Sequence, residues 1–233
     1  MLREIVLDTE TTGLDPNSGH RLIELGCVEL INRFPSGQTF HHYLDPERDV
    51  PPDAERVHGI STAMLKGKPL FKAIADDFIA FISDATLIIH NASFDVGFLN
   101  AELTKVGKLP ITFDRVVDTL ALARRKHPGA QNSLDALCKR YQIDNSSRKK
   151  HGALLDSELL AEIYLELIGG HQAKLDLSAE ARATTLNGPK RVKVSPRPVP
   201  LKSRLTAEER AAHIEFVAKL KEPIWAKYDA TED

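Results

Sequence analysis

Short apolar runs and amphipathic stretches alternate along the first 170 residues of the chain. Runs with strand character cover residues 4–8, 21–32, 38–44, 86–89 and 116–117. Helices are expected over residues 53–57, 69–82, 94–106, 119–125, 133–141 and 154–168. A meander of three strands followed by alternating strands and helices predicts an α/β domain. We expect a mixed five-stranded sheet flanked by helices, with the strand at residues 116–117 in a central position.

The pattern changes beyond Gly169 and Gly170, which end the last of these helices. Residues 190–204 contain lysines, arginines and prolines but no acidic residue, so they cannot bury enough apolar surface to fold and are predicted to be a linker. Thr206 and Glu209 have the spacing of a capping box in front of a final amphipathic helix. The predicted organisation is a folded domain over residues 1–170, a flexible linker over 171–205, and a C-terminal tail with a short helix over 206–233.

The composition excludes several classes of protein. The 233 residues carry a net charge of −2, which argues against a protein that coats nucleic acid by charge alone. Cys27 and Cys138 lie in apolar surroundings and suit two reduced, buried thiols better than a disulfide or a zinc site. No apolar run is long enough to cross a bilayer and no signal peptide is visible, so we expect a cytoplasmic protein without a membrane partner.

Candidate chemistry begins with Asp8 and Glu10, which lie two residues apart at the end of the first predicted strand. Strand alternation places both carboxylates on one face of the sheet, although a solvated sheet edge also explains such a pair. Asp95 falls in the first turn of a predicted helix, where the helix dipole favours an acid. Asp156 lies early in a strongly apolar helix, and His151 lies in the loop before it. Each of these residues, taken alone, has an ordinary structural explanation.

Together, the four acids and the histidine have the composition of a site that cleaves phosphodiesters with two metal ions. Carboxylate oxygens suit hard cations such as Mg²⁺ or Mn²⁺. Two such ions about 3.5–4 Å apart stabilise the attacking and leaving oxygens. A phosphodiester cannot approach bare carboxylates unless cations intervene. Histidine, with an intrinsic pKa of about 6.5, can take a proton from water close to neutral pH.

Four motifs carry a resemblance to a known family. They are VLDTETTGL at residues 6–14, VHGI at 57–60, HNASFD at 90–95, and a histidine and an aspartate five residues apart at 151 and 156. In order and spacing, the chain resembles the DEDDh 3′→5′ exonucleases, and among them the proofreading subunits of bacterial replicative DNA polymerases. The resemblance covers residues 4–168. It implies a ribonuclease H-like fold and an enzyme of the nucleoid-associated replisome that acts on a single-stranded or frayed 3′ end of DNA.

The resemblance also implies a role for each motif residue. Asp8, Glu10 and Asp156 would bind two divalent ions, Mg²⁺ or Mn²⁺, with Asp95 supporting the second ion and His151 acting as general base. The residues expected to contact the terminal nucleotide and the strand, besides the acids Asp8, Glu10 and Asp156, are Thr11, Gly13, Leu14, Val57, His58, Asn91 and Phe94. Core packing explains Val57 and Phe94 equally well. Asp53 occupies the place of a family acid that contacts this nucleotide, and it is one methylene shorter than the glutamate usual there.

The region after the domain has signals of its own. Residues 172–177 (QAKLDL) are similar to the short peptide by which bacterial polymerase partners bind the sliding clamp, with Gln172, Leu175 and Leu177 at its key positions. Six loosely specified residues also arise by chance. The final helix, with Trp225, is expected to bind a groove of the replicative polymerase α subunit. The resemblance further implies a small theta-like subunit as a partner.

Two alternatives share parts of this pattern. An RNA-trimming exonuclease of the same superfamily, of the oligoribonuclease or ribonuclease T type, would have the same catalytic residues. A compact RNase would not need the long linker and the terminal helix. A non-catalytic interaction subunit would keep the tail, but the intact acids and His151 argue against a decayed site.

Overall fold

The computed structural model describes residues 1–148, 150–169 and 205–220. The chain divides into two units, Met1–Leu175 and Asp176–Asp233. The predicted linker falls largely outside the described residues, and so do Gln172, Leu175, Leu177 and Trp225. No helix in the described residues is long and apolar enough to cross a membrane.

The first unit is built on a mixed five-stranded sheet, as the apolar pattern predicts. Its strands are β1 (Arg3–Thr11), β2 (Leu22–Ile31), β3 (Phe34–Tyr43), β4 (Thr86–Ile89) and β5 (Val116–Asp118). The strand order is β3-β2-β1-β4-β5. The first three strands pair antiparallel, whereas β4 pairs parallel with both β1 and β5.

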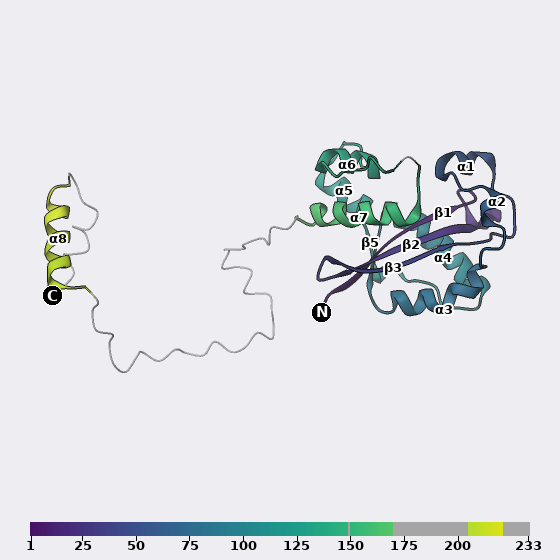
Figure 1. Cartoon of the computed structure of the whole chain (residues 1–233), viewed down its shortest axis with the longest axis horizontal. Helices are drawn as coiled ribbons and strands as arrows, with labels where there is room; N and C mark the ends of the chain where they lie inside the picture. The colour runs from purple at the N-terminus through teal and green to yellow at the C-terminus, as the bar shows by residue number, and fades with distance from the viewer. Residues whose placement is uncertain (149, 170–204, 221–233) are drawn as a thin grey trace. The chain divides into compact units, whose positions relative to one another are not determined.

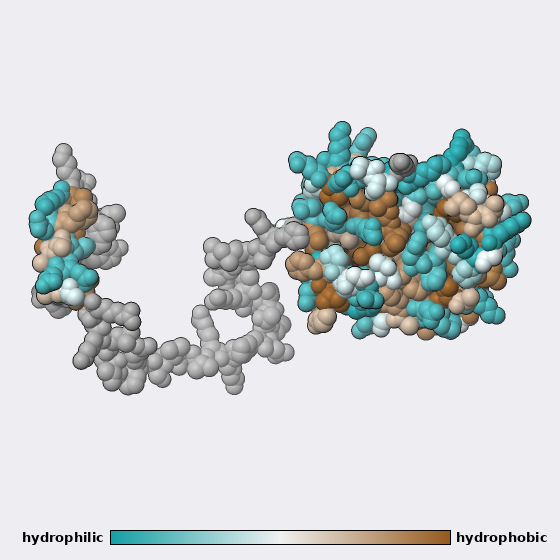
Figure 2. Space-filling view, viewed as in Figure 1, coloured by the Kyte–Doolittle hydropathy of each residue, from teal (hydrophilic) through white to brown (hydrophobic). Residues whose placement is uncertain are grey.

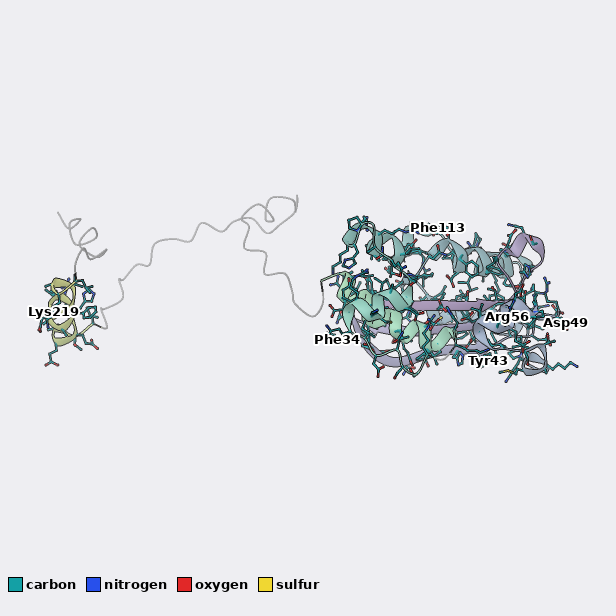
Figure 3. The ribbon with its side chains drawn as sticks, turned by 90° about the horizontal axis from the view of Figure 1, so that it is seen from above. Phe34, Tyr43, Asp49, Arg56, Phe113 and Lys219 are labelled. Carbon is teal, nitrogen blue, oxygen red and sulfur yellow. The ribbon has the colours of Figure 1, made fainter. Side chains whose placement is uncertain are left out.

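Three details of the predicted sheet are wrong. The first strand was expected to end at residue 8, but β1 continues to Thr11. The strand at residues 116–117 was expected to be central, but β5 is an edge strand and β1 is central. Val116 and Val117 are only partly buried, so two apolar residues in a short strand do not by themselves indicate a central position. The third strand begins at Phe34 rather than at residue 38. The apolar pattern missed its first half because these residues are exposed and lack the alternation that burial imposes. Figure 3 shows Phe34 and Tyr43 at opposite ends of β3.

The predicted helices all form, each with ends within about two residues of the expected ones. They are α1 (Pro52–His58), α3 (Phe71–Ile82), α4 (Ala92–Lys105), α5 (Thr119–Lys126), α6 (Leu134–Tyr141) and α7 (Ala153–Leu167). The pattern missed α2 (Thr62–Leu65), which at four residues is too short to show a period. In the second unit, α8 (Ala207–Ala218) begins with the predicted capping box of Thr206 and Glu209. Hydrophobic residues lie on its surface (Figure 2).

The sheet is covered on both faces, with α7 on one face and α3 and α4 on the other (Figure 1). Alternation along β1 divides its side chains between two cores. Ile5 and Leu7 belong to the core that includes Phe78 of α3, whereas Val6 belongs to the core that includes Leu160 of α7. Residues of β1 with even numbers therefore face α7. Cys27 and Cys138 are free and buried, as expected from the composition.

Gly26 lets the start of α7 approach the sheet closely. It pairs with Asp8 in the β1–β2 ladder. A Cβ atom on Gly26 would lie only 2.3 Å from the carbonyl carbon of Ala153. The hydroxyl of Ser157 donates to the carbonyl oxygen of Gly26 at 3.0 Å. The first turn of α7 is thus held directly against the strand next to Asp8.

We expect Gly26→Ala to destabilise the protein by about 1–3 kcal/mol, because the added methyl group meets backbone that cannot move without lifting α7 from the sheet. Urea unfolding followed by circular dichroism measures the change. Gly97→Ala is the matched control, since a Cβ atom at Gly97 in α4 meets nothing within 4 Å. Equal unfolding midpoints for the two variants would show that α7 does not depend on this close approach.

Candidate active site

Two of the predicted acids project from β1 toward α7. Asp8 and Glu10 share the face of β1 that carries Val6, and Glu10 is buried. Glu24 lies opposite Glu10 in the β1–β2 ladder and is also buried, with His41 Nε2 2.7 Å from its Oε1 atom. The two adjacent strands therefore bring several carboxylates together, and those of Glu10 and Glu24 are buried.

Helices from the two faces of the sheet bring the other two acids. Asp156 lies in the first turn of α7 and Asp95 in the first turn of α4, and both are buried. Thr9, which lies between Asp8 and Glu10 and points to the opposite face, donates from its hydroxyl to Asp95 Oδ1 at 2.7 Å. Because β1 has α4 on one side and α7 on the other, its end is the place where all four acids converge.

His151 completes the group from the loop before α7. Its side chain is 47% exposed, and Nδ1 lies 3.5 Å from Asp156 Oδ2. A carboxylate oxygen of Glu10, a ring nitrogen of His151 and a carboxylate oxygen of Asp156 lie within 4.8 Å of one another. The backbone N–H of His151 donates to the carbonyl oxygen of Val57 at 3.4 Å, which links this loop to α1. The structure thus brings together the five residues that the motifs single out.

Burial makes this concentration of negative charge costly. Burial, followed by repulsion from Asp95, Glu10 and Asp156, raises the pKa of Asp8 well above its usual range. Burial and the neighbouring acids raise the pKa of Glu10 to about 8, and burial is the main cause that raises the pKa of Asp95 to about 7. At Asp156 burial acts in the same direction, but hydrogen bonds from Arg148 and His151 outweigh it and lower the pKa.

The donor set fits divalent cations. Carboxylate oxygens with one imidazole nitrogen are ligands for hard or borderline ions such as Mg²⁺ and Mn²⁺. A cation among these carboxylates would also relieve the repulsion that raises the pKa values of Asp8 and Glu10. The cluster of Asp8, Glu10, Asp95, His151 and Asp156 is therefore suited to hold metal ions.

We expect the unfolding temperature in EDTA to fall as the pH rises from about 6 to 9, and to fall less in Glu10→Gln. A carboxyl with a folded pKa above its unfolded value binds a proton on folding, so its contribution to stability is present at low pH. That contribution is lost as the pH rises through the folded pKa, which is about 7 for Asp95 and about 8 for Glu10. Thermal unfolding across this pH range tests the expectation, with Glu158→Gln, at an exposed position of α7, as control. Parallel curves for wild type and Glu10→Gln would contradict it.

The residues expected to contact a nucleotide lie in different environments. Leu14 is 85% exposed and Val57 is 50% exposed, so core packing does not explain Val57. Phe94 is partly buried against Phe98, with ring centroids 5.1 Å apart, and therefore has a packing role. Thr11 donates from its hydroxyl to the carbonyl oxygen of Gly13 at 2.6 Å, which braces the turn after β1.

Three further predicted residues, His58, Asn91 and Asp53, differ in their burial and in their local contacts. His58 is buried, and its Nδ1 atom accepts a hydrogen bond from the N–H of Ile60 at 3.0 Å. Asn91 is exposed at the start of α4 with a left-handed backbone, φ 62°. Asp53 is exposed in the first turn of α1, and within the described residues its carboxylate pairs with Arg56 rather than with the acid cluster. Arg56 is labelled in Figure 3.

Sequence reasoning missed Arg148. Its guanidinium group contacts both oxygens of Asp156, with Nε 2.5 Å from Oδ1 and Nη2 2.7 Å from Oδ2. It also donates to Asp135 Oδ1 at 2.7 Å and lies 2.9 Å from His151 Nδ1. A basic run at residues 148–150 is an ordinary loop composition, so no sequence signal marks this arginine. A cavity of about 480 Å³ opens beside it, lined among others by Asp8, His90, Arg124, Asn132, Arg148 and Asp156.

Comparison with known proteins agrees with this geometry. A sequence profile of the family described as Exonuclease matches residues 5–164. The DNA polymerase III subunit epsilon of Rickettsia felis is 48% identical over 222 residues, which cover 94% of this chain and 97% of that protein. The protein of the same name from Salmonella typhimurium is 47% identical, covering 91% of this chain and 90% of the relative.

Solved structures show the same fold. Exonuclease X, in complex with 5′ overhanging duplex DNA, has 27% sequence identity and a TM-score of 0.56 over 71% of this chain and 90% of its own. The nuclease domain of 3′hExo, a DEDDh family member bound to rAMP, has a TM-score of 0.62 at 20% identity, over 71% of this chain and 91% of its own.

The mixed sheet and the helices on its two faces thus agree with the fold of these exonucleases, and the ribonuclease H-like fold expected from the motifs is confirmed. Exonucleases of this fold use divalent metal ions. The chain belongs to the exonuclease family, in the group of the DNA polymerase III epsilon subunits, and is a 3′→5′ exonuclease.

Proposed function

We propose that this chain removes mispaired 3′-terminal nucleotides from DNA as the proofreading subunit of a replicative DNA polymerase III. The observation that carries the proposal is the convergence of four carboxylates and one histidine at the end of β1. Glu10, His151 and Asp156 can approach one ion, and Asp8 and Asp95 lie close enough to these acids for their charges to repel. The epsilon relatives cover nearly the whole chain, including the region after the first unit, which favours this function over that of a compact RNase.

In this proposal the cluster holds two Mg²⁺ or Mn²⁺ ions. Asp8, Glu10 and Asp156 would bind them directly, and Asp95, braced by the Thr9 hydroxyl, would support the second ion. When bound, the ions neutralise the carboxylates and stabilise the charge that develops on the attacking and leaving oxygens. His151, exposed in its loop beside Asp156, takes the proton from the attacking water as the bond to the terminal nucleotide breaks.

The residues around the cluster would guide the 3′ end of the strand. The exposed side chains of Leu14 and Val57 offer apolar surface for the terminal base and sugar. Asn91 and Phe94, at the start of α4, would line the strand on the other side, together with Thr11, Gly13 and His58 near the cluster. Asp53 pairs with Arg56 through one carboxylate oxygen, so this exposed ion pair would compete with a contact to the terminal nucleotide.

The partners proposed here are assigned to the part of the chain that follows residue 170. Ile214, Phe216 and Leu220 are exposed on or next to α8, and apolar residues of this kind suit a helix that docks in a groove. We propose that this region, with Trp225, binds the polymerase α subunit, and that Gln172, Leu175 and Leu177 bind the sliding clamp. A small theta-like subunit would complete the assembly, which would act in the bacterial cytoplasm at the nucleoid.

One assay tests the catalytic proposal. Full-length protein is given DNA with a mispaired 3′ end, the matched duplex, and an RNA strand of the same sequence, each with Mg²⁺ or with EDTA. We expect metal-dependent release of single nucleotides from the mispaired DNA, faster than from the matched duplex or the RNA. Preferential degradation of RNA would favour the RNA-trimming alternative, and absence of any metal-dependent turnover would favour a non-catalytic subunit.

A second experiment tests the assembly. Residues 1–170 and residues 171–233 are used separately to capture the polymerase α subunit. We expect the C-terminal fragment to bind and the N-terminal fragment not to bind, because the proposed anchor lies in the tail. The reverse result would show that the tail is not the link to the polymerase.

A further inference from the structure

The loop between α6 and α7 places a positive side chain inside the acid cluster. The side chain of Arg148 is 6% exposed, although it comes from a basic loop at the surface. Its guanidinium group contacts both carboxylate oxygens of Asp156 at 2.5 and 2.7 Å and Asp135 of α6 at 2.7 Å. A planar guanidinium with two parallel N–H donors on one carboxylate is the strongest geometry available to such a pair.

The same guanidinium group also contacts His151. Nη2 lies 2.9 Å from His151 Nδ1, and because an arginine N–H can only donate, Nδ1 accepts this hydrogen bond in the neutral tautomer that carries its proton on Nε2. The lone pair on that nitrogen is therefore engaged while the contact lasts. Arg148 thus occupies, at the same time, both oxygens of a proposed metal ligand and a nitrogen of the proposed general base.

A divalent ion would compete with this arrangement. The grouping of Glu10, His151 and Asp156 that could bind an ion uses a carboxylate oxygen of Asp156, and both of these oxygens contact Arg148. Two cations held by one carboxylate repel each other strongly in a buried site. The ion therefore binds more tightly when the guanidinium has withdrawn.

The structure contains space for the Arg148 side chain after it leaves Asp156. The cavity of about 480 Å³ beside the cluster is lined by both residues, so the guanidinium can move without unpacking the core. Asp135 is 61% exposed and contacts a different nitrogen of Arg148, Nη1, so this second ion pair can persist through the movement. One ion pair can break while the other keeps the loop attached to α6.

We propose that Arg148 is a positioning residue that holds Asp156 and His151 before metal binds, and that it then releases Asp156 to bind the incoming ion and His151 to act as the general base. The proposal rests on the metal site of the proposed function. It makes Arg148 the residue that sets how much divalent metal the enzyme needs. Its removal should tighten metal binding.

Isothermal titration of the full-length chain with Mn²⁺ tests this, with Arg148→Gln compared with wild type. We expect the dissociation constant for Mn²⁺ to fall by about tenfold in Arg148→Gln, since a competing cation is gone. The unfolding temperature in EDTA should fall, because Asp156 loses its partner, and the gain in unfolding temperature on adding Mn²⁺ should grow. The Mn²⁺ concentration for half-maximal nuclease rate should fall in parallel with the dissociation constant.

Two further variants separate charge from shape. Arg148→Lys keeps the charge but loses the two-pronged contact, so its Mn²⁺ affinity should lie between those of wild type and Arg148→Gln. It also serves as the test variant if Arg148→Gln does not fold. Arg125→Gln removes the same charge from an exposed position of α5 and should leave Mn²⁺ affinity unchanged.

The outcomes distinguish this inference from the function on which it rests. If wild type does not bind Mn²⁺, or if Asp156→Asn binds it as well as wild type, the proposed metal site is wrong. If wild type binds Mn²⁺ through Asp156 but Arg148→Gln binds it equally or more weakly, the metal site stands and the role of Arg148 is overturned. A residue that merely stabilises the loop would lower the unfolding temperature without tightening Mn²⁺ binding.

Discussion

Asp8→Asn is expected to lower the nuclease rate at saturating Mg²⁺ by at least about 10³-fold, since metal ions stabilise such transition states by several kcal/mol. Asp8 lies on central strand β1 among three other acids, and asparagine keeps its shape while removing the charge that would bind the ions. The fold should survive, because repulsion from Asp95, Glu10 and Asp156 already disfavours the ionised carboxylate. Single-turnover hydrolysis of single-stranded DNA measures the rate.

The control for this variant is Asp84→Asn, which removes an aspartate from the exposed loop between α3 and β4. It should hydrolyse DNA at the wild-type rate. Thermal unfolding in EDTA provides the second readout, with Asp8→Asn at least as stable as wild type. A variant of Asp8 that is fully folded and still turns over at a near-normal rate would remove the basis for the two-metal assignment.

His151→Ala is expected to behave differently from the acid variant. Its rate should fall by roughly 10²–10⁴, which is the usual contribution of a positioned general base. Binding of Mn²⁺ and of single-stranded DNA should stay close to wild type, because the side chain is 47% exposed in a loop and the carboxylates provide the main charge of the site. Rate and Mn²⁺ affinity are to be measured on the same preparation.

The competing role for His151 is that of a metal ligand, since it can approach one ion together with Glu10 and Asp156. In that case the Mn²⁺ affinity of His151→Ala would fall in parallel with the rate. Saturating Mn²⁺ would then restore much of the lost activity. Rescue of this kind would show that His151 is a metal ligand and not the general base.

The sequence by itself determined most of the local structure and the identity of the chemical groups. Alternation along residues 4–8 and the spacing of Asp8 and Glu10 were enough to place both acids on one face of a strand. The apolar pattern located the helices that carry Asp95 and Asp156, and both acids lie in the first turns of these helices, as expected. These features depend on residues close together in the chain, which is why a pattern can reveal them.

Only the tertiary structure decided how these groups are held, because the deciding contacts join residues far apart in the chain. The Thr9 hydroxyl supports Asp95 across 86 positions, and Ser157 reaches Gly26 across 131. The closeness of α7 to β2 depends on the missing side chain of Gly26, which no periodicity reveals. The edge position of β5 follows from its pairing with β4 alone. Arg148 is near Asp156 in sequence, but its burial against that carboxylate depends on where α6 and α7 bring the loop. These contacts are decided by packing and charge in three dimensions, and the spacing of residues along the chain does not predict them.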